Sequence, residues 1–117
     1  TRETRNMIRR SHLLTMKKGA LLVNTARGGI INEADLADVL ESGHLGGAAI
    51  DVFANEPYAG PLADLDRTLL TCHMGSMSVD CRSRMEIEAT EEVVRHYRAE
   101  PLHNLVPGEE YEEQERR

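Results

Sequence analysis

The chain has 117 residues, of which 40% are apolar, and its formal net charge is −6 at neutral pH. This length allows one small domain with a modest core, and the apolar fraction excludes a chain that is disordered by composition. The basic residues are scattered along the sequence, which argues against nucleic acid as a partner. No apolar run reaches the roughly 18 residues of a membrane span, so no membrane-spanning segment is expected.

The start of the chain and its two cysteines give further expectations. No signal peptide is visible, and the chain begins with Thr1 rather than Met, which predicts a fragment or a processed chain. Cys72 and Cys81 have a spacing that fits no metal site, and reduced thiols in the cytoplasm are the default for such a chain. We therefore expect a cytoplasmic protein without a metal site. Cys72 is expected to be a small core residue, and the alternative is a reactive thiol beside His73.

The first part of the chain predicts a helix, a strand and a second helix. A short helical stretch is expected within residues 11–19, with Gly19 as its stop. The apolar run at residues 20–26 has the length of a strand, and its continuity favours burial on both faces, as in parallel sheets. Asn32 is a suitable N-cap for the second helix, which Gly43 ends.

Two more strands and a long helix follow. Residues 47–53 and 68–73 are predicted strands, and the loop between them contains two prolines. From about Ser78 to Arg98, apolar residues recur every four positions, which predicts an amphipathic helix of about five turns. This succession of strands and helices is typical of one half of a doubly wound α/β sheet.

Polar side chains stand at the ends of all three predicted strands. Arg27 follows the first strand, Asp51 ends the apolar core of the second, and His73 ends the third. In open parallel sheets, ligands bind beyond the carboxyl ends of the strands. We therefore expect these three side chains to share one edge of the sheet and to form a binding site there.

Arg27 has two interpretations. It is either an ordinary surface residue or a fork for a carboxylate, because a planar guanidinium makes two parallel hydrogen bonds to such a group. Gly28 and Gly29 favour the second interpretation, since they allow the backbone to approach a neighbour closely.

His73 and Glu56 form a candidate acid–base pair, and Asp51 stays open between two roles. An imidazole that acts as a general acid needs a partner that fixes its tautomer, and Glu56 lies upstream in a loop that Pro57 stiffens. Asp51 either caps a turn or accepts a hydrogen bond from a ligand amide. The spacing of the residues alone favours neither role.

Three segments, LLVNTARGG, GHLGGAAIDVFANEP and LLTCHMGS, occur in this order. Together they resemble the D-isomer-specific 2-hydroxyacid dehydrogenases, and the resemblance extends from Thr1 to about Arg98. It implies an α/β fold, namely the C-terminal half of a Rossmann-type parallel-sheet NAD-binding domain plus a long C-terminal helix. It also divides the chain into part of the NAD-binding domain at residues 1–76, a helix crossing towards the substrate domain at 77–98, and a charged tail at 99–117.

The resemblance further implies an activity and a set of site residues. The implied activity is hydride transfer between NAD or NADP and a D-2-hydroxy acid or 2-oxo acid, in a protein that forms a homodimer. The implied catalytic residues are Arg27, which binds the substrate carboxylate, Glu56, and the general acid–base His73. The implied cofactor contacts are Thr1, Thr25, Ala26, Arg27, Asp51, His73, Met74, Gly75 and Ser76.

Two features depart from the family pattern. Cys72 stands where the family usually has proline, so His73 is expected to be held less rigidly. The chain also contains no Gly-x-Gly-x-x-Gly motif, so half of the cofactor site is expected upstream of Thr1. Two other interpretations stay open: an NAD-binding corepressor scaffold of the same family, and a truncated fragment that is inactive by itself.

Overall fold

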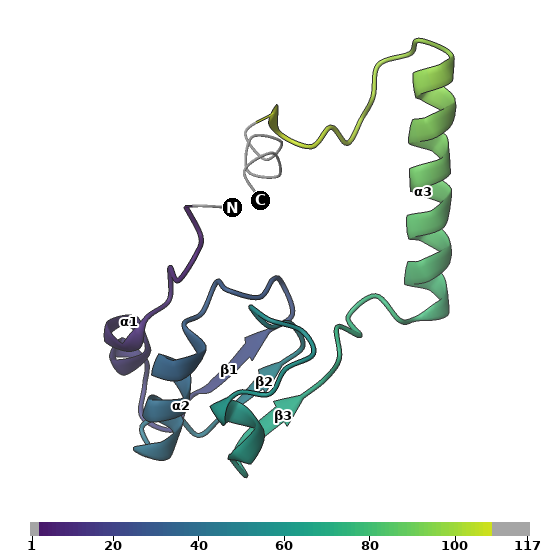
Figure 1. The fold of residues 1–117 in the computed structure, drawn as a ribbon. Coiled ribbons are helices and arrows are strands. Elements are labelled where there is room, and N and C mark those ends of the chain that lie inside the picture. Colours follow the sequence, from purple (N-terminus) through teal and green to yellow (C-terminus); the bar gives the residue numbers. More distant parts are fainter. Residues whose placement is uncertain (1–2, 109–117) are drawn as a thin grey trace. The chain divides into compact units, whose positions relative to one another are not determined.

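The computed structural model describes residues 3–108 (Figure 1). The chain separates into two compact units, Thr1–Gly75 and Ser76–Arg117. Thr1, one of the implied cofactor contacts, and the charged tail from residue 109 onward lie outside the described residues.

Three parallel strands form the sheet of the first unit, in the order β1, β2, β3 (Figure 1). Asn24 pairs with Ile50, and Ile50 pairs with Leu70, so the strands end in register. The predicted parallel sheet is confirmed, but each strand ends two or three residues earlier than predicted, because the chain there turns into the loops that carry the polar side chains. The strands span Leu21–Asn24 (β1), Gly47–Ile50 (β2) and Thr68–Leu70 (β3).

Local signals at the helix ends explain where the helices of the first unit begin and stop. The Asn32 side chain caps α2 by accepting a hydrogen bond from the amide of Asp35 at 3.0 Å. Gly43 ends this helix in the left-handed region, with φ of 73°. The Asp35 carboxylate also accepts from the amide of Arg10 at 2.8 Å, which joins the start of α1 to α2. The helical segments are α1 (Arg10–Thr15), α2 (Glu33–Glu41) and the short 3-10 helix η1 (Pro61–Asp64).

One face of the sheet carries the core. Side chains of β1 and β2 pack there against α1, α2 and η1, in a cluster that includes Leu13, Leu22, Leu36, Ile50 and Leu62. No helix of the first unit covers the other face. Within this unit the prediction that β1 is buried on both faces is wrong: Leu21 is 74% and Val23 is 67% exposed, and Leu69 of β3 is 65% exposed.

The second unit contains the predicted long helix, α3 (Val79–Tyr97). The side chain of Ser78 caps it by accepting from the amide of Cys81 at 3.2 Å. None of its residues is buried, and the apolar stripe that the sequence predicts is exposed at Met85 and Val93. No helix in the described part of the chain combines the length and apolarity needed to cross a membrane.

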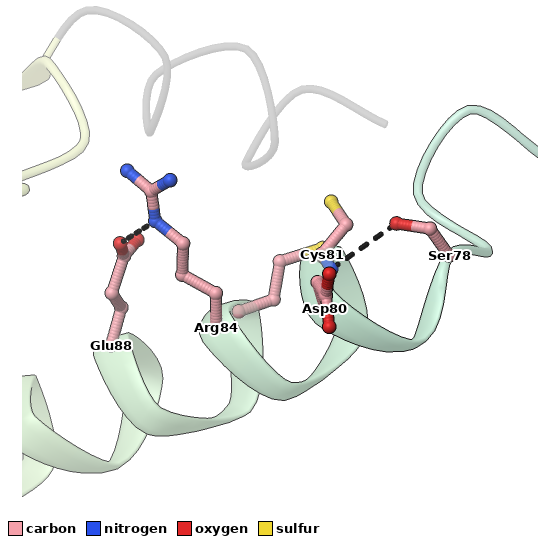
Figure 2. Close-up of a pocket in the computed structure, with 6 residues that line it drawn as sticks. Ser78, Asp80, Cys81, Arg84 and Glu88 are labelled. Atoms are coloured by element: carbon pink, nitrogen blue, oxygen red, sulfur yellow. Dashed lines mark hydrogen bonds and ion pairs between the residues drawn. The ribbon is translucent and has the colours of Figure 1, made fainter.

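A hollow of about 490 Å³ lies along the first turns of α3 (Figure 2). Within it the guanidinium of Arg84 donates to the carboxylate of Glu88 at 3.0 Å, so these charges already neutralise each other. None of the site residues predicted from the sequence lines this hollow. This hollow is therefore a surface of α3 on which the opposite charges of Arg84 and Glu88 pair with each other. The candidate catalytic residues lie in the first unit.

Candidate active site

The candidate site lies at the edge where the three strands end. Beyond the last strand pairs, the amide of Asp51 donates to the carbonyl oxygen of Asn24 at 3.0 Å, and the amide of His73 donates to the carbonyl oxygen of Asp51 at 2.8 Å. These bonds continue the strand pairing into the loops. The segments that follow β1, β2 and β3 are thereby held next to one another.

Asn24 shapes the turn that presents Arg27. It is buried, with 8% of its surface exposed, and its Oδ1 accepts from the amide of Ala26 at 3.1 Å while its Nδ2 donates to the carbonyl oxygen of Arg27 at 3.2 Å. The Arg27 guanidinium is exposed and donates to the carbonyl oxygen of Ala26 at 2.7 Å. Within residues 3–108 no carboxylate forms an ion pair with Arg27. Sequence reasoning missed Asn24, although an amide inside an apolar strand was the available signal.

Gly28 packs its backbone directly against the loop that follows β2. A Cβ atom at this position would lie 1.8 Å from the carbonyl oxygen of Phe53 and 2.7 Å from the amide nitrogen of Ala54. No side chain fits such a gap, so glycine is required there. This contact ties the Arg27 turn to the loop that carries Glu56.

Two carboxylates hold the loop that carries Glu56. Glu56 Oε1 accepts from the amide of Phe53 at 3.1 Å, within the loop itself. Glu33 Oε1, from the first turn of α2, accepts from the amide of Ala54 at 2.7 Å. Sequence reasoning missed this contact, because nothing in the local sequence relates positions 33 and 54.

The structure brings Glu56 and His73 together. Glu56 Oε2 lies 3.7 Å from His73 Nδ1, a distance at which the two groups form an ion pair when the imidazole is charged but no direct hydrogen bond. Both side chains are about half exposed, at 44% and 51%. Glu56 thus uses one oxygen to hold its own loop and turns the other towards His73.

Asp51 is the most enclosed charged group of the site, with 5% of its surface exposed. Its carboxylate accepts from the hydroxyl of Thr71, from the amide of Met74 at 2.7 Å and from the amide of Gly75 at 2.8 Å. The Thr71 bond, followed by the Met74 bond, lowers the pKa of Asp51, because these donors favour the charged carboxylate. Sequence reasoning named Asp51 but missed Thr71.

A shallow hollow of about 510 Å³ opens beside Glu56. The stacked rings of Phe53 and Tyr58, whose centroids are 4.2 Å apart, contribute to its lining, and so does Cys72. Cys72 is exposed, so the expectation of a core cysteine is wrong: the strand has already ended at Leu70. The residues lining the hollow are Phe53, Glu56, Pro57, Tyr58, Ala63, Leu70, Thr71, Cys72 and Met74.

The remaining implied cofactor contacts fall into two groups. Thr25 and Ala26 are exposed in the turn after β1. Met74 and Gly75 follow His73 in the loop that Asp51 holds, whereas Ser76 is the first residue of the second unit. Among the described residues, no group of three or more His, Cys, Asp or Glu side chains is placed to hold a metal ion.

Comparisons with known proteins agree with this architecture. The family model described as "D-isomer specific 2-hydroxyacid dehydrogenase, NAD binding domain" matches residues 1–75. D-3-phosphoglycerate dehydrogenase of Bacillus subtilis is 36% identical over 107 residues, which are 91% of this chain and 20% of that protein. The chain thus spans about a fifth of the length of this curated relative.

Solved structures show the same fold. A glyoxylate reductase from Paecilomyes thermophila superimposes with a TM-score of 0.84 at 34% identity, covering 93% of this chain and 34% of that one. A D-isomer specific 2-hydroxyacid dehydrogenase from Xanthobacter autotrophicus, solved in complex with NADPH, superimposes with a TM-score of 0.78 at 34% identity, covering 91% of this chain and 44% of that one.

Proposed function

The chain belongs to the NAD-binding domain of the D-isomer specific 2-hydroxyacid dehydrogenase family, and from this premise we propose that the whole protein is an NAD- or NADP-dependent oxidoreductase. Its reaction is hydride transfer between the nicotinamide and the carbon that carries the hydroxyl or oxo group of a D-2-hydroxy acid or 2-oxo acid. Residues 1–76 supply the second half of the NAD-binding domain, 77–98 the helix that crosses towards the substrate domain, and 99–117 a charged tail.

The observation that carries this proposal is a chain of contacts that joins three loops. Gly28 packs on Phe53, the amide of Phe53 donates to Glu56, and Glu56 faces His73 at 3.7 Å. Arg27 is the residue directly before Gly28. The turn with Arg27 is therefore joined to the Glu56–His73 pair at one edge of the sheet. This arrangement supports the proposal, because reduction of a 2-oxo acid requires a group that binds the carboxylate and a group that donates a proton.

Each of these side chains has one role in the reduction. Arg27 binds and orients the substrate carboxylate, and its exposed guanidinium, without an acidic partner in residues 3–108, is available for that purpose. His73 donates a proton to the carbonyl oxygen as the hydride arrives at the carbon. Glu56 stabilises the imidazolium before the transfer. Orientation by such groups contributes several kcal/mol to lowering the barrier, on the order of 7 or more in well-aligned cases.

The residues present fit the nicotinamide half of a dinucleotide. The carboxylate of Asp51 has about four lone-pair positions, and its three hydrogen bonds leave one on Oδ2 for a donor such as a carboxamide. Thr25 and Ala26 are exposed in the turn beside it. When bound, the cofactor supplies the hydride acceptor or donor. Thr1, Arg27, His73, Met74, Gly75 and Ser76 complete the proposed cofactor contacts, and the missing glycine-rich motif assigns the adenosine half to another part of the protein.

We also propose that the protein is a cytoplasmic homodimer, as the family resemblance implies. Both Cys72 and Cys81 are free thiols, which favours a reducing compartment. Light scattering of the full-length protein tests the dimer: a mass of two chains agrees with it, and a mass of one chain contradicts it.

Turnover by the full-length protein tests the proposed activity. NADH and NADPH are each mixed with a panel of 2-oxo acids, and oxidation of the nicotinamide is followed by absorbance. We expect turnover with at least one acid, abolished in His73→Ala. Binding of the dinucleotide without turnover on any acid would instead favour a corepressor scaffold and contradict the proposed reaction.

A further inference from the structure

Three successive backbone amides after β3 converge on one residue. The amide of His73 donates to the main-chain carbonyl oxygen of Asp51 at 2.8 Å. The amide of Met74 donates to Asp51 Oδ1 at 2.7 Å, and the amide of Gly75 donates to Asp51 Oδ2 at 2.8 Å. Asp51 therefore holds the loop through both its backbone and its side chain.

Thr71 completes this arrangement from the strand side. Its hydroxyl donates to Asp51 Oδ1, the same oxygen that accepts from Met74. The amide of Thr71 donates to the carbonyl oxygen of Ile50 at 3.0 Å, so its own backbone is fixed to β2. The Asp51 side chain is thus aimed by a residue that the sheet already positions, and its two oxygens are turned towards the loop amides.

The loop needs such support because of the conformation of His73. Its φ of 55° lies in the left-handed region, which is unfavourable for a residue with a Cβ atom. A backbone of this kind persists only where its surroundings hold it, and it often marks a functional residue. Hydrogen bonds to a charged carboxylate are the stronger kind, and the Asp51 carboxylate accepts from the Thr71 hydroxyl before His73 and from the amides of Met74 and Gly75 after it.

Burial and fit add to this support. Asp51 is 5% exposed, so water competes little for its oxygens. Gly75 lies so close that a Cβ atom there would be 3.3 Å from Asp51 Oδ2, tighter than most such contacts. Cys72, the residue before His73, cannot fix the backbone as a proline would.

We propose that Asp51 and Thr71 are positioning residues that clamp the loop 73–75 and so set the place of the His73 imidazole. We call this group of contacts the Asp51 clamp. The proposal rests on the proposed function, because the clamp acts on the reaction through His73. It differs from a role of Asp51 in cofactor binding, since Thr71, whose hydroxyl donates to Asp51 Oδ1, is not among the proposed cofactor contacts.

Hydrogen–deuterium exchange of the full-length protein tests the clamp without reference to activity. Fragmentation after exchange resolves the exchange rates of the individual amides of Met74 and Gly75. The exchange rates of the β2 amides serve as the internal control. In Asp51→Ala we expect Met74 and Gly75 to exchange at least tenfold faster, with β2 unchanged. Equal exchange of Met74 and Gly75 in the parent and in Asp51→Ala would overturn the proposal.

Thr71→Val keeps the shape of the side chain and removes only the hydrogen-bond donor. If Asp51→Ala also accelerates exchange in β2, and so disturbs the sheet itself, Thr71→Val is the variant that tests the clamp. Faster exchange at Met74 and Gly75 in this variant supports the clamp, and parent-like exchange at both overturns it. Thr71→Ser restores the hydroxyl and should restore the parent rates.

Kinetics of the same variants separate positioning from cofactor binding. In Thr71→Val we expect kcat for 2-oxo acid reduction to fall about tenfold, KM for the dinucleotide to change less than twofold, and Thr71→Ser to recover most of the loss. A rise in KM for the dinucleotide at unchanged kcat would overturn the positioning role. Absence of turnover in the parent would refute the proposed function, whereas the exchange rates would still decide whether Asp51 holds the loop.

Discussion

The contact between Gly28 and the carbonyl oxygen of Phe53 gives the sharpest perturbation of the site. In Gly28→Ala the new Cβ atom would lie 1.8 Å from that oxygen, whereas ordinary contacts begin at 3.4 Å. Because the three nearest atoms belong to the backbone of Phe53 and Ala54, no flexible side chain can give way. The turn that carries Arg27 and the loop that carries Glu56 must therefore separate by about 1.6 Å.

A separation of this size is large on the scale of catalysis. Displacement of a reacting group by about 1 Å costs roughly 10²-fold in rate, which corresponds to about 2.7 kcal/mol. We expect kcat/KM of Gly28→Ala for 2-oxo acid reduction to fall by roughly 10²-fold or more. The assay is steady-state oxidation of NADH or NADPH by the full-length protein.

Gly29→Ala is the matched control for Gly28→Ala. A Cβ atom at Gly29 meets nothing within 4 Å, but its φ of 75° strains any residue other than glycine. This variant should lose about 1 to 2 kcal/mol of stability from the strain, with a much smaller loss of kcat/KM. If Gly28→Ala keeps the parent kcat/KM, the two loops do not position the catalytic groups, and the reasoning is wrong.

Three further predictions concern other parts of the site. Arg27→Lys keeps the charge but loses the bidentate fork, so kcat/KM should fall by roughly 10²-fold with little change in dinucleotide affinity; an unchanged kcat/KM would make Arg27 a surface residue. The pKa of Asp51 is lowered in the folded protein, so the charged carboxylate stabilises the fold fully above about pH 4, the usual pKa of an aspartate. This stabilisation is lost as the pH falls through the lowered pKa of the folded protein. The midpoint of thermal unfolding should therefore fall less between about pH 5 and pH 2 in Asp51→Asn than in the parent, and equal acid sensitivity would count against the clamp. The 117-residue chain by itself should associate through its open sheet face and show no measurable NADH affinity in calorimetric titration, and a micromolar dissociation constant would contradict this.

Much of the fold was predictable because it is encoded locally. The N-cap Asn32 and the left-handed Gly43 are short-range signals, and each stands where the sequence predicts it. The sequence also predicts the start of the long helix near Ser78, but the cap formed by the Ser78 side chain was found only in the structure. The strand ends were not predictable in the same way. Val52 and Phe53 are apolar and extend the run, but the chain has already left the sheet after Ile50. The bends there depend on hydrogen bonds between loops that only the folded chain brings together.

The candidate site shows the same division. Arg27 and His73 were recognisable because each stands at the end of an apolar run, and Asp51 because it is the one charged residue inside such a run. Glu33 and Thr71 were not recognisable, because each forms its hydrogen bond with a residue about 20 positions away in the sequence. A local sequence pattern does not predict such a contact. The prediction that β1 is buried on both faces was wrong for a related reason. Whether a strand is buried depends on which other segments cover the sheet, and the sequence of the strand does not show this.

Isotope transfer tests the central claim most directly. The full-length protein is incubated with a 2-oxo acid and NADH that carries deuterium in place of both hydrogens at C4 of the nicotinamide, and the product is analysed by mass spectrometry and on a chiral column. We predict a D-2-hydroxy acid with deuterium on C2, formed by the parent and lost in His73→Ala. A product without deuterium, an L-hydroxy acid, or undiminished formation in His73→Ala would contradict the proposed reaction and the role of His73.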